Sequence, residues 1–333
     1  MYADNNRGNG RKTTMENRTL AILLAVYEPR EDWLIELLDS LNAQTYPRLS
    51  LYVRDDASPT YPTERLRKVL SEHVTNFPFT LLQNEQNCGS NETFSRLVRD
   101  CKEDYIAFCD QDDVWHPDKL ENTVRLFEES ELHPTAVCAN VSIIDGDGKL
   151  IADSIDKHRR RHVFLRGNDV APTLIYRNFV MGCTMLMERE RALSYLPVPQ
   201  EVVHDHYLAF RAAADGALDF LNEPQMRYRI YGGNQTGVMT GVRSKEDYRH
   251  RRIDLFDARV RCFAESVSLP ELDRALAWSR ARTDCFEHKK GGWRALWRLR
   301  KTNLVTSLFE LTVLRLPTPL FRLAIRLVQK GIL

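Results

Sequence analysis

Residues 105–120 read YIAFCDQDDVWHPDKL. The apolar run Tyr105–Cys109 is typical of a strand that is buried on both faces, as in a parallel sheet. It leads directly into Asp110, Asp112 and Asp113, whose carboxylates would repel one another strongly unless a cation lay between them. Mg²⁺ or Mn²⁺, together with phosphate oxygens, is the usual solution. The stretch therefore predicts a metal site at the carboxyl end of a buried strand, with a turn or a helix N-terminus as the structural alternative.

Strands and helices alternate on either side of this stretch. Short apolar runs predict strands, and apolar residues at helical spacing predict helices between them. The predicted strands are 19–26, 49–54, 79–82 and 105–109, and the predicted helices are 30–43, 63–74, 91–101 and one that starts near Pro117. This alternation predicts an α/β fold with a parallel sheet, on which ligands bind beyond the carboxyl ends of the strands.

The pattern becomes less regular after residue 136. We expect a strand at 136–144, a turn at 145–148 that closes a hairpin, a strand at 179–187, a helix at 204–214 and a strand near 217–221. From residue 244 to the end the pattern is mostly helical. The chain thus divides into an α/β part and a helical part.

A second acidic pair, Asp55 and Asp56, ends the predicted strand 49–54. A carboxylate just beyond a parallel strand is well placed to accept hydrogen bonds from a ribose hydroxyl or a base N–H. An Asx turn accounts for the same residues. The pair by itself therefore leaves both interpretations open.

The composition excludes several classes of protein. The chain has 333 residues, of which 43% are apolar and 28% charged, as in ordinary folded domains. A net charge of +1 argues against a dedicated nucleic-acid binder, and the chain lacks the long apolar run of a membrane-spanning helix. Seven cysteines without a C-x-x-C pair fit a reducing cytosol. Residues 1–18 are polar, so we interpret them as a disordered leader.

The end of the chain is basic. Residues 289–333 carry ten Lys or Arg and one acid, Glu310. Tryptophan and leucine alternate with these cations, a pattern that is typical of a helix lying on an anionic bilayer. Helices that pack on the rest of the protein and present a basic outer face are the alternative. We expect membrane association through this region.

Three turns identify a resemblance to a known family. VYEP (26–29), RDDASPT (54–60) and FCDQDDVWHPDKL (108–120) resemble, in order and spacing, the landmarks of glycosyltransferase family 2, which are inverting enzymes with the GT-A fold. Further along, NFVMGCTM (178–185), VHDHYL (203–208) and YRIYGGN (228–234) resemble segments of bacterial rhamnosyltransferase-like members. The resemblance covers about residues 19–237.

The resemblance implies a domain organisation. A GT-A domain, with a Rossmann-like and mostly parallel sheet flanked by helices, would span 19–243. Its nucleotide-sugar half would be 19–130 and its acceptor half 131–243. The basic helical extension would be 244–333.

It also implies roles for individual residues. Asp110 and Asp112 match the metal-binding carboxylates, with Asp112 favoured as the direct ligand and Asp110 also near the nucleotide sugar. Asp205 matches the catalytic base. The residues that match the nucleoside pocket are Asp55, Asp56, Tyr27 and Glu28.

Other residues are expected to support the site. Asp113 is the last acid of the cluster, and Trp115 follows it. Trp115 would either line the sugar site or pack beneath the loop. His204 and His206 flank the predicted base, where each would orient Asp205, bind diphosphate or metal, or pack structurally. The supporting set is Asp113, Trp115, His204 and His206.

Tyr231 departs from the family pattern. Members that read Y-R-Q-H often use this histidine near the metal or the diphosphate, and a neutral phenol is a poor ligand for a divalent metal. The third protein ligand is therefore left open. Arg229, two residues earlier, remains a candidate contact for the diphosphate.

The sequence thus predicts an inverting glycosyltransferase that depends on Mg²⁺ or Mn²⁺. Its donor would be a dTDP- or UDP-linked sugar, with rhamnose as the first candidate, and its acceptor a glycan or a lipid-linked glycan in bacterial surface polysaccharide synthesis. We expect a cytoplasmic protein at the inner face of the membrane. The alternatives are a non-catalytic sugar-nucleotide-binding protein and a nucleotidyltransferase, although the latter should show a Gly-rich phosphate loop after its first strand.

Overall fold

The computed structural model of the chain describes residues 18–159, 162–231, 239 and 241–329. The predicted leader 1–18 therefore lies, apart from Arg18, outside the described residues. Contacts divide the chain into two compact units. The first comprises 1–174 and 178–231, and the second comprises 175–177 and 232–333. The predicted domain limits at 19, 130 and 243 stay a prediction.

In the described part of the first unit the strands form one nine-stranded sheet, ordered β3-β2-β1-β4-β8-β6-β9-β5, with β7 paired to β6. The strands are β1 (Leu20–Val26), β2 (Leu49–Asp55), β3 (Phe79–Gln83), β4 (Tyr105–Cys109), β5 (Val114–Trp115), β6 (Ala136–Ile144), β7 (Leu150–Ala152), β8 (Leu186–Glu188) and β9 (Leu218–Arg229). Strands β1 to β4 are mutually parallel, and β6 is parallel to β9. The sheet is therefore mixed but mostly parallel.

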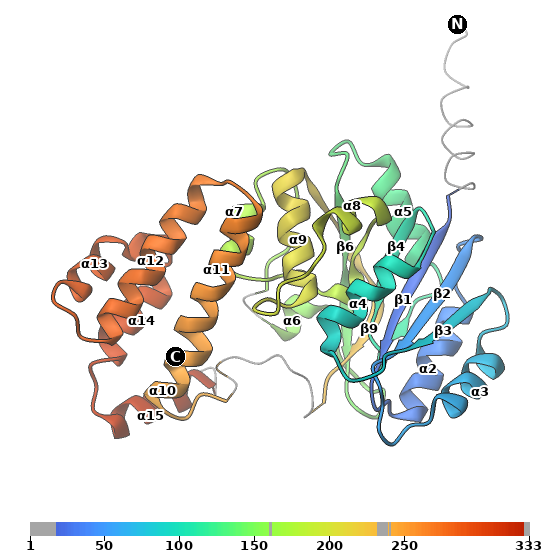
Figure 1. Ribbon diagram of the computed structural model, residues 1–333, viewed down its shortest axis with the longest axis horizontal. Helices are drawn as coiled ribbons and strands as arrows, with labels where there is room; N and C mark the ends of the chain where they lie inside the picture. The colour runs from blue at the N-terminus through green and yellow to red at the C-terminus, as the bar shows by residue number, and fades with distance from the viewer. Residues whose placement is uncertain (1–17, 160–161, 232–238, 240, 330–333) are drawn as a thin grey trace, which may run out of the picture. The chain divides into compact units, whose positions relative to one another are not determined.

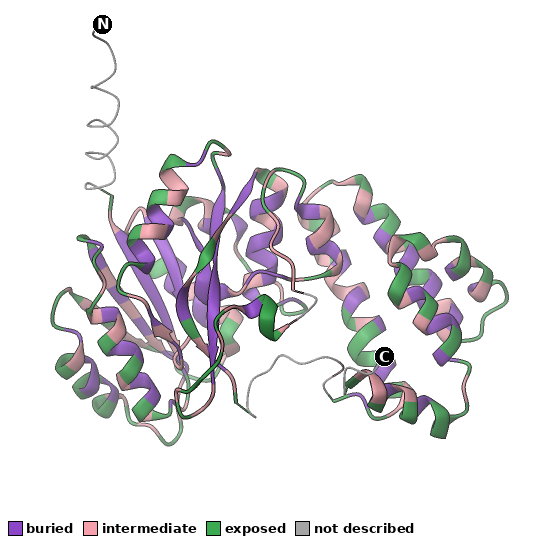
Figure 2. Cartoon of the chain, turned by 180° about the vertical axis from the view of Figure 1, so that it is seen from behind, coloured by how far each residue is buried: buried purple, intermediate pink, exposed green. Residues whose placement is uncertain are grey.

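Helices cover both faces of this sheet. Figures 1 and 2 show α2, α3 and α5 on one face and α4, α8 and α9 on the other. The helices of this unit are α2 (Glu31–Asn42), α3 (Thr63–His73), α4 (Gly89–Asp100), α5 (Lys119–Glu129), α6 (Ile155–His158), α7 (Ala171–Tyr176, which ends in the second unit), α8 (Arg189–Tyr195) and α9 (His204–Asp215), with a 3₁₀ turn η1 (Gly182–Thr184). Because they cover the sheet, β4 and β6 are buried along their whole lengths, as their unbroken apolar sequences predict.

The predicted strands 19–26, 49–54, 79–82, 105–109 and 136–144 agree with the observed strands to within one residue at each end. The hairpin is confirmed, since β7 pairs antiparallel with β6. The predicted strand 179–187 is wrong over most of its length, because Gly182–Thr184 form a 3₁₀ turn whose first N–H donates to Asp205. The predicted strand near 217–221 is too short. Pairing with β6 extends β9 to Arg229.

The second unit is helical, as the sequence predicts. Its elements after α7 are α10 (Lys245–Tyr248), a π-helical turn η2 (Arg249–Asp254), α11 (Leu255–Ser266), α12 (Pro270–Phe286), α13 (Gly292–Arg298), a 3₁₀ turn η3 (Arg300–Thr302), α14 (Leu304–Val313) and α15 (Thr318–Gln329). One of its cores joins α10, α14 and α15 through Tyr248, Val313 and Phe321. None of the helices in the described residues has the length and apolar character needed to cross a membrane.

A buried ion pair ties this unit together. Arg282 of α12 donates to both carboxylate oxygens of Glu310 of α14 at 2.6–2.9 Å, and both side chains are buried. The hydroxyl of Tyr248 donates to the same carboxylate at 2.9 Å. The acid that the sequence places alone among the basic residues of 289–333 is thus neutralised inside the unit.

Candidate active site

The three predicted carboxylates follow β4. Asp110 comes directly after Cys109, and Asp112 and Asp113 lie in the turn before β5. Ligand atoms of Asp110, Asp113 and the Cys183 thiol lie within 4.8 Å of one another. Asp113 is completely buried. Its Oδ1 accepts the Arg229 backbone N–H at 3.0 Å, whereas its Oδ2 has no hydrogen-bond partner among the described residues.

Burial raises the pKa values of all three carboxyls, and crowding by like charges adds to the effect for Asp110 and Asp113. Burial raises the pKa of Asp110 to about 7, and the charges of Asp112 and Asp205 add to the effect. The pKa of Asp113 lies well above its usual range, because the group is buried and faces Asp112 and Asp110. Burial also raises the pKa of Asp112. A cation among these groups would remove the repulsion and favour their charged forms.

The donor atoms suit a hard divalent cation. Carboxylate oxygens are the preferred protein ligands of Mg²⁺ and Mn²⁺, and the unpartnered Oδ2 of Asp113 belongs to this cluster. Burial raises the pKa of the Cys183 thiol well above its ordinary value, so the sulfur stays protonated and is a poor ligand. The residues therefore fit a site for a divalent metal, held by carboxylates rather than by the thiol.

Tyr231, the departure from the family pattern, lies beside this cluster. Its hydroxyl forms a hydrogen bond with Asp112, which favours the charged carboxylate and so opposes the effect of burial on its pKa. Burial and the charge of Asp112 raise the pKa of the phenol, so it stays protonated and acts as the donor. The ring packs on Trp33 with centroids 4.7 Å apart. Tyr231 thus holds a predicted metal ligand in place.

Asp205 lies in the first turn of α9. Its carboxylate accepts hydrogen bonds from the Asn178 amide at 3.2 Å, the Gly182 N–H at 3.3 Å and the His206 N–H. A Cβ at Gly182 would lie 3.0 Å from Nε2 of His204 and 3.1 Å from Cβ of Asp205, so a side chain there would crowd both residues. Burial outweighs these bonds and raises the pKa of Asp205 to about 6. Its charge acts on Asp110, so the predicted base and the acidic cluster share one electrostatic environment.

The two histidines beside Asp205 are held in the interior. His204 lies 4.3 Å from Phe94 and 5.7 Å from Phe108 between ring centroids, and neither of its nitrogens has a hydrogen-bond partner among the described residues. Burial lowers its pKa to about 4, so it is neutral. The Nε2 of His206 lies 2.6 Å from the carbonyl oxygen of Leu174. These contacts favour the packing alternative for both.

Asp55 and Asp56 end β2 and are engaged in hydrogen bonds. Oδ1 of Asp55 accepts from the N–H and hydroxyl of Ser58, which is the turn that the sequence left open. Asp56 accepts from the Asn84 amide at 2.7 Å and from the N–H groups of Cys88 and Gly89 at 2.9 Å. Burial opposes ionisation of Asp56, but these donors outweigh it and lower its pKa. The predicted contact of this pair with a nucleoside stays a prediction.

Tyr27 and Glu28 follow β1 and border the same edge. The Tyr27 side chain is 44% exposed, and its backbone N–H and C=O pair with the Gln111 amide at 2.9 and 3.0 Å. The Glu28 carboxylate accepts from the backbone N–H and hydroxyl of Thr60, and these bonds lower its pKa. The two turns predicted to line the nucleoside pocket are therefore fastened to each other and to the acidic loop.

Arg229 and Trp115 are buried. The guanidinium of Arg229 donates to the Asp112 carbonyl at 2.8 Å, to the carbonyls of Asp145 and Gly146 at 3.3 Å, and to the Glu36 carboxylate. It therefore braces the acidic loop, and the diphosphate contact stays a prediction. Trp115 is 2% exposed and lies in the core, which favours its packing alternative.

Lys119 is a further buried charge beneath the cluster. Its ammonium donates to the Cys183 carbonyl at 2.6 Å and lies 3.0 Å from the centre of the Trp115 ring. Burial lowers its pKa to about 8, and the nearby Asp113 and Asp110 counteract part of that effect. Its charge lowers the pKa of Asp110, as the charge of Arg229 lowers that of Asp112, so the two cations compensate part of the negative charge.

Comparison with known proteins identifies the family. The model of Glycosyl transferase family 2 matches residues 21–190, about half of the chain. The chain belongs to glycosyl transferase family 2. The matched region contains the turns after β1 and β2 and the complete acidic cluster, whereas Asp205 lies beyond its end.

Relatives of this chain include a named sugar transferase. It is 24% identical to the dTDP-rhamnosyl transferase RfbG of Shigella flexneri over 230 residues, which are 65% of this chain and 74% of that protein. It is 27% identical over 214 residues to three uncharacterized mycobacterial proteins, but spans only 58% of their length.

Solved structures show the same fold. TarS of S. aureus, in complex with UDP-GlcNAc, aligns with a TM-score of 0.57 at 15% identity over 94% of this chain and 92% of that chain. The mannosyltransferase PcManGT from Pyrobaculum calidifontis, in complex with GDP-Man and Mn²⁺, aligns with a TM-score of 0.54 at 15% identity over 95% of this chain and 81% of that chain. The predicted GT-A architecture with a helical C-terminal region is confirmed.

Sequence reasoning on this glycosyltransferase missed Lys119, Asn178 and Gln111 as parts of the site. Lys119 lies in the quoted HPDKL segment and Asn178 in NFVMGCTM, so both belong to recognisable motifs. For Asn178 the available signal was a polar residue next to the apolar run Phe179–Met181, whereas for Lys119 it was only membership of the motif. Gln111 offered only its place between two aspartates.

Proposed function

We propose that this chain is an inverting, metal-dependent glycosyltransferase that moves a sugar from a nucleoside diphosphate to a hydroxyl of a glycan or glycolipid. The observation that carries the proposal is that Asp205 and the acidic cluster meet at one turn, where the Gly182 N–H donates to Asp205 at 3.3 Å and the Cys183 thiol lies within 4.8 Å of ligand atoms of Asp110 and Asp113. The charge of Asp205 also raises the pKa of Asp110. A base for the acceptor and a cation site for the leaving diphosphate are the two groups that a single displacement needs.

Asp205 would act as the base. In the displacement the acceptor oxygen bonds to the anomeric carbon from the face opposite the diphosphate, the bond from that carbon to the diphosphate oxygen breaks, and Asp205 takes the hydroxyl proton. A carboxyl with a pKa of about 6 is mostly ionised at neutral pH yet basic enough to accept a proton. The donors from Asn178 and Gly182 would keep its carboxylate oriented.

Asp112 and Asp110 would hold Mg²⁺ or Mn²⁺, with Asp113 behind them. When bound, the ion would stabilise the negative charge of the departing diphosphate. Tyr231 would orient Asp112 through its hydroxyl, and Arg229 would hold the loop through the Asp112 carbonyl. The structure of PcManGT in complex with GDP-Man and Mn²⁺ supports the choice of ion class.

The donor would lie over the turns that contain Tyr27, Glu28, Asp55 and Asp56. The likeness to RfbG, named as a dTDP-rhamnosyl transferase, supports dTDP-rhamnose as the first donor to test, ahead of UDP- and GDP-sugars. The acceptor would be a glycan or lipid-linked glycan of a bacterial surface polysaccharide, as the name of the amylovoran biosynthesis relative AmsB supports.

The protein would work in the cytoplasm, at the membrane surface. Large apolar side chains of α13, α14 and α15 are exposed beside basic residues, which is the arrangement of an interfacial segment. The exposed set is Trp297, Leu304, Val305, Leu308, Leu320 and Leu323.

The experiment that tests the proposal is release of nucleoside diphosphate from dTDP-, UDP- and GDP-sugars, with and without Mn²⁺ or Mg²⁺ and a lipid-linked acceptor. We expect metal-dependent release from one donor, abolished in Asp112→Asn and retained in Asp273→Asn, an exposed acid of α12. Release that persists undiminished in Asp112→Asn would overturn the metal-site assignment. Donor binding without release under any condition would favour the non-catalytic alternative.

A further inference from the structure

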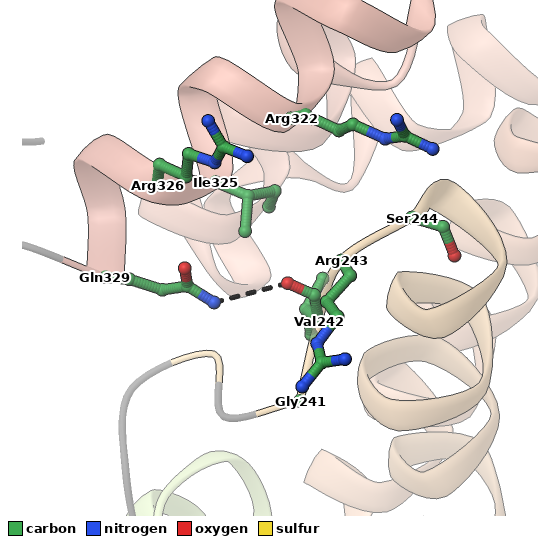
Figure 3. A pocket seen from close by; sticks show the side chains of 8 residues that line it. All are labelled: Gly241, Val242, Arg243, Ser244, Arg322, Ile325, Arg326 and Gln329. Carbon is green, nitrogen blue, oxygen red and sulfur yellow. Dashed lines mark hydrogen bonds between the residues drawn. The ribbon is translucent and has the colours of Figure 1, made fainter.

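A basic pocket lies within the second unit, away from every residue assigned above. It has a volume of about 490 Å³, which is within the range of small-molecule sites. Figure 3 shows its two sides. Helix α15 contributes Arg322, Ile325, Arg326 and Gln329, and the segment before α10 contributes Arg243 and Ser244.

The three arginines of the pocket are exposed, and no ion pair with an acid is found for Arg243, Arg322 or Arg326 among the described residues. The neighbouring carboxylate, Asp247, is already occupied, because it accepts the backbone N–H groups of Arg243 and Ser244 at 2.9 Å. Three guanidinium groups thus line one cavity without an ion pair to an acid among the described residues.

The backbone around the pocket is fixed by specific contacts. Gln329 donates to the carbonyls of Met239 and Val242 at 3.0 and 3.2 Å, which fastens the end of α15 to the opposite side. Gly241 has a φ of +73°, and a Cβ there would lie 2.8 Å from the guanidinium carbon of Arg251. A fourth cation therefore packs against the same segment, so the positive charge has a defined arrangement.

We infer that this pocket binds a phosphate group, and specifically the phosphate of an anionic lipid at the membrane surface. Guanidinium groups match phosphate oxygens through paired N–H donors, so a phosphate is the anion that this lining favours. Leu320 and Leu323, exposed on the same helix as Arg322 and Arg326, place apolar side chains where acyl chains would lie beside the headgroup. The lipid as the source of the phosphate rests on the membrane association proposed above.

The test uses the full chain and vesicles of phosphatidylcholine with or without phosphatidylglycerol. Arg322→Gln together with Arg326→Gln should weaken binding to the anionic vesicles about 25-fold, because each arginine contributes a factor of about five. The matched control is Arg274→Gln with Arg280→Gln, two exposed arginines of α12 outside the pocket, which should cost less than about fivefold. Inorganic pyrophosphate should raise the melting temperature of the wild type and the control pair, but not of the pocket pair.

The outcomes separate the pocket from the membrane proposal. If the variant with both Arg322→Gln and Arg326→Gln bound vesicles as well as the wild type does, the phosphate site would be overturned and membrane association would remain. A pyrophosphate response that depends on the pocket, without vesicle binding by the wild type, would support phosphate recognition but overturn the lipid source and the proposed membrane association together. Equal losses in both arginine pairs would mean a diffuse basic surface and would overturn the pocket.

Discussion

Asp110, Asp112 and Asp113 bury like charges side by side in the first unit, whereas Arg282 and Glu310 bury opposite charges in bidentate contact in the second. In the first unit the pKa values of the carboxyls rise, so keeping them together without a cation costs the fold free energy. In the second unit the two charges satisfy each other. A crowded acidic cluster that the protein neutralises only in part indicates a ligand, and a buried pair that is neutralised indicates structure.

The strongest way to break the acidic site is Asp205→Asn. If Asp205 is the base, the turnover number should fall about 10²- to 10⁴-fold, because the acceptor proton loses its carboxylate. Transfer to a defined acceptor, followed with Asp215→Asn at the other end of α9 as control, measures this. Unchanged turnover in Asp205→Asn would remove the base assignment.

The pH dependence of activity and of stability tests the same assignment of Asp205 as the base. Because the pKa of Asp205 is about 6, kcat/KM should rise with pH through about 6 as the base ionises. Since the folded-state pKa is raised above the unfolded value, protonated Asp205 contributes stability that is present below about pH 4 and lost as pH rises toward 6. Asp205→Asn should abolish the rise in kcat/KM but remove only the contribution of Asp205 to the stability trend, because the raised pKa values of Asp110 and Asp113 remain. Rates and unfolding midpoints across this range measure the two effects.

Loss of either partner of the buried ion pair should destabilise the second unit. Arg282→Met leaves Glu310 buried and unpaired, which should lower the free energy of unfolding by about 3–5 kcal/mol. Adding Glu310→Leu should restore most of that loss, because no buried charge remains. Urea unfolding monitored by the fluorescence of Trp278, which is buried beside the pair, is the measurement. A double variant as unstable as the single one would contradict this account.

Mn²⁺ should stabilise the folded protein by binding at the acidic cluster and not at the ion pair of the second unit. At a concentration of about 100 times its dissociation constant, an ion that binds the folded state adds about 2.7 kcal/mol. The gain should grow as pH rises through 7, because Asp110, with a pKa of about 7, must lose its proton to bind. Calorimetry of the wild type beside Asp112→Asn tests this, and an equal gain in both would show that Mn²⁺ binds elsewhere.

Tyr231→Phe should have the smallest effect. It removes one hydrogen bond to Asp112, worth about 0.5–1.5 kcal/mol, so the Mn²⁺ concentration for half-maximal activity should rise by about two- to tenfold. The matched control is Tyr52→Phe on β2, which removes a hydroxyl that lies 3.5 Å from the Glu103 carboxylate. No difference between the two variants would mean that Tyr231 does not position the ligand.

Local signals were sufficient for most of the sheet and for the family. Buried strands such as β1 and β4 are continuous apolar runs, and the acidic turn follows β4 without a gap, so periodicity and motif order predicted them. The 3₁₀ turn at Gly182–Thr184 escaped prediction. Its apolar composition is that of a strand, and only the contact of Gly182 with Asp205 requires the turn.

The sequence by itself determined the fold class, the family and the chemical types gathered at the site. Tertiary structure decided which side chains meet, such as the Arg229 N–H on Asp113, Lys119 beneath the cluster, and Arg322 opposite Arg243. The physical reason is how far apart in the sequence the interacting residues lie. Strand and helix patterns come from neighbouring residues, whereas charge compensation depends on groups brought together by folding from positions as far apart as Glu36 and Arg229, which are 193 residues apart.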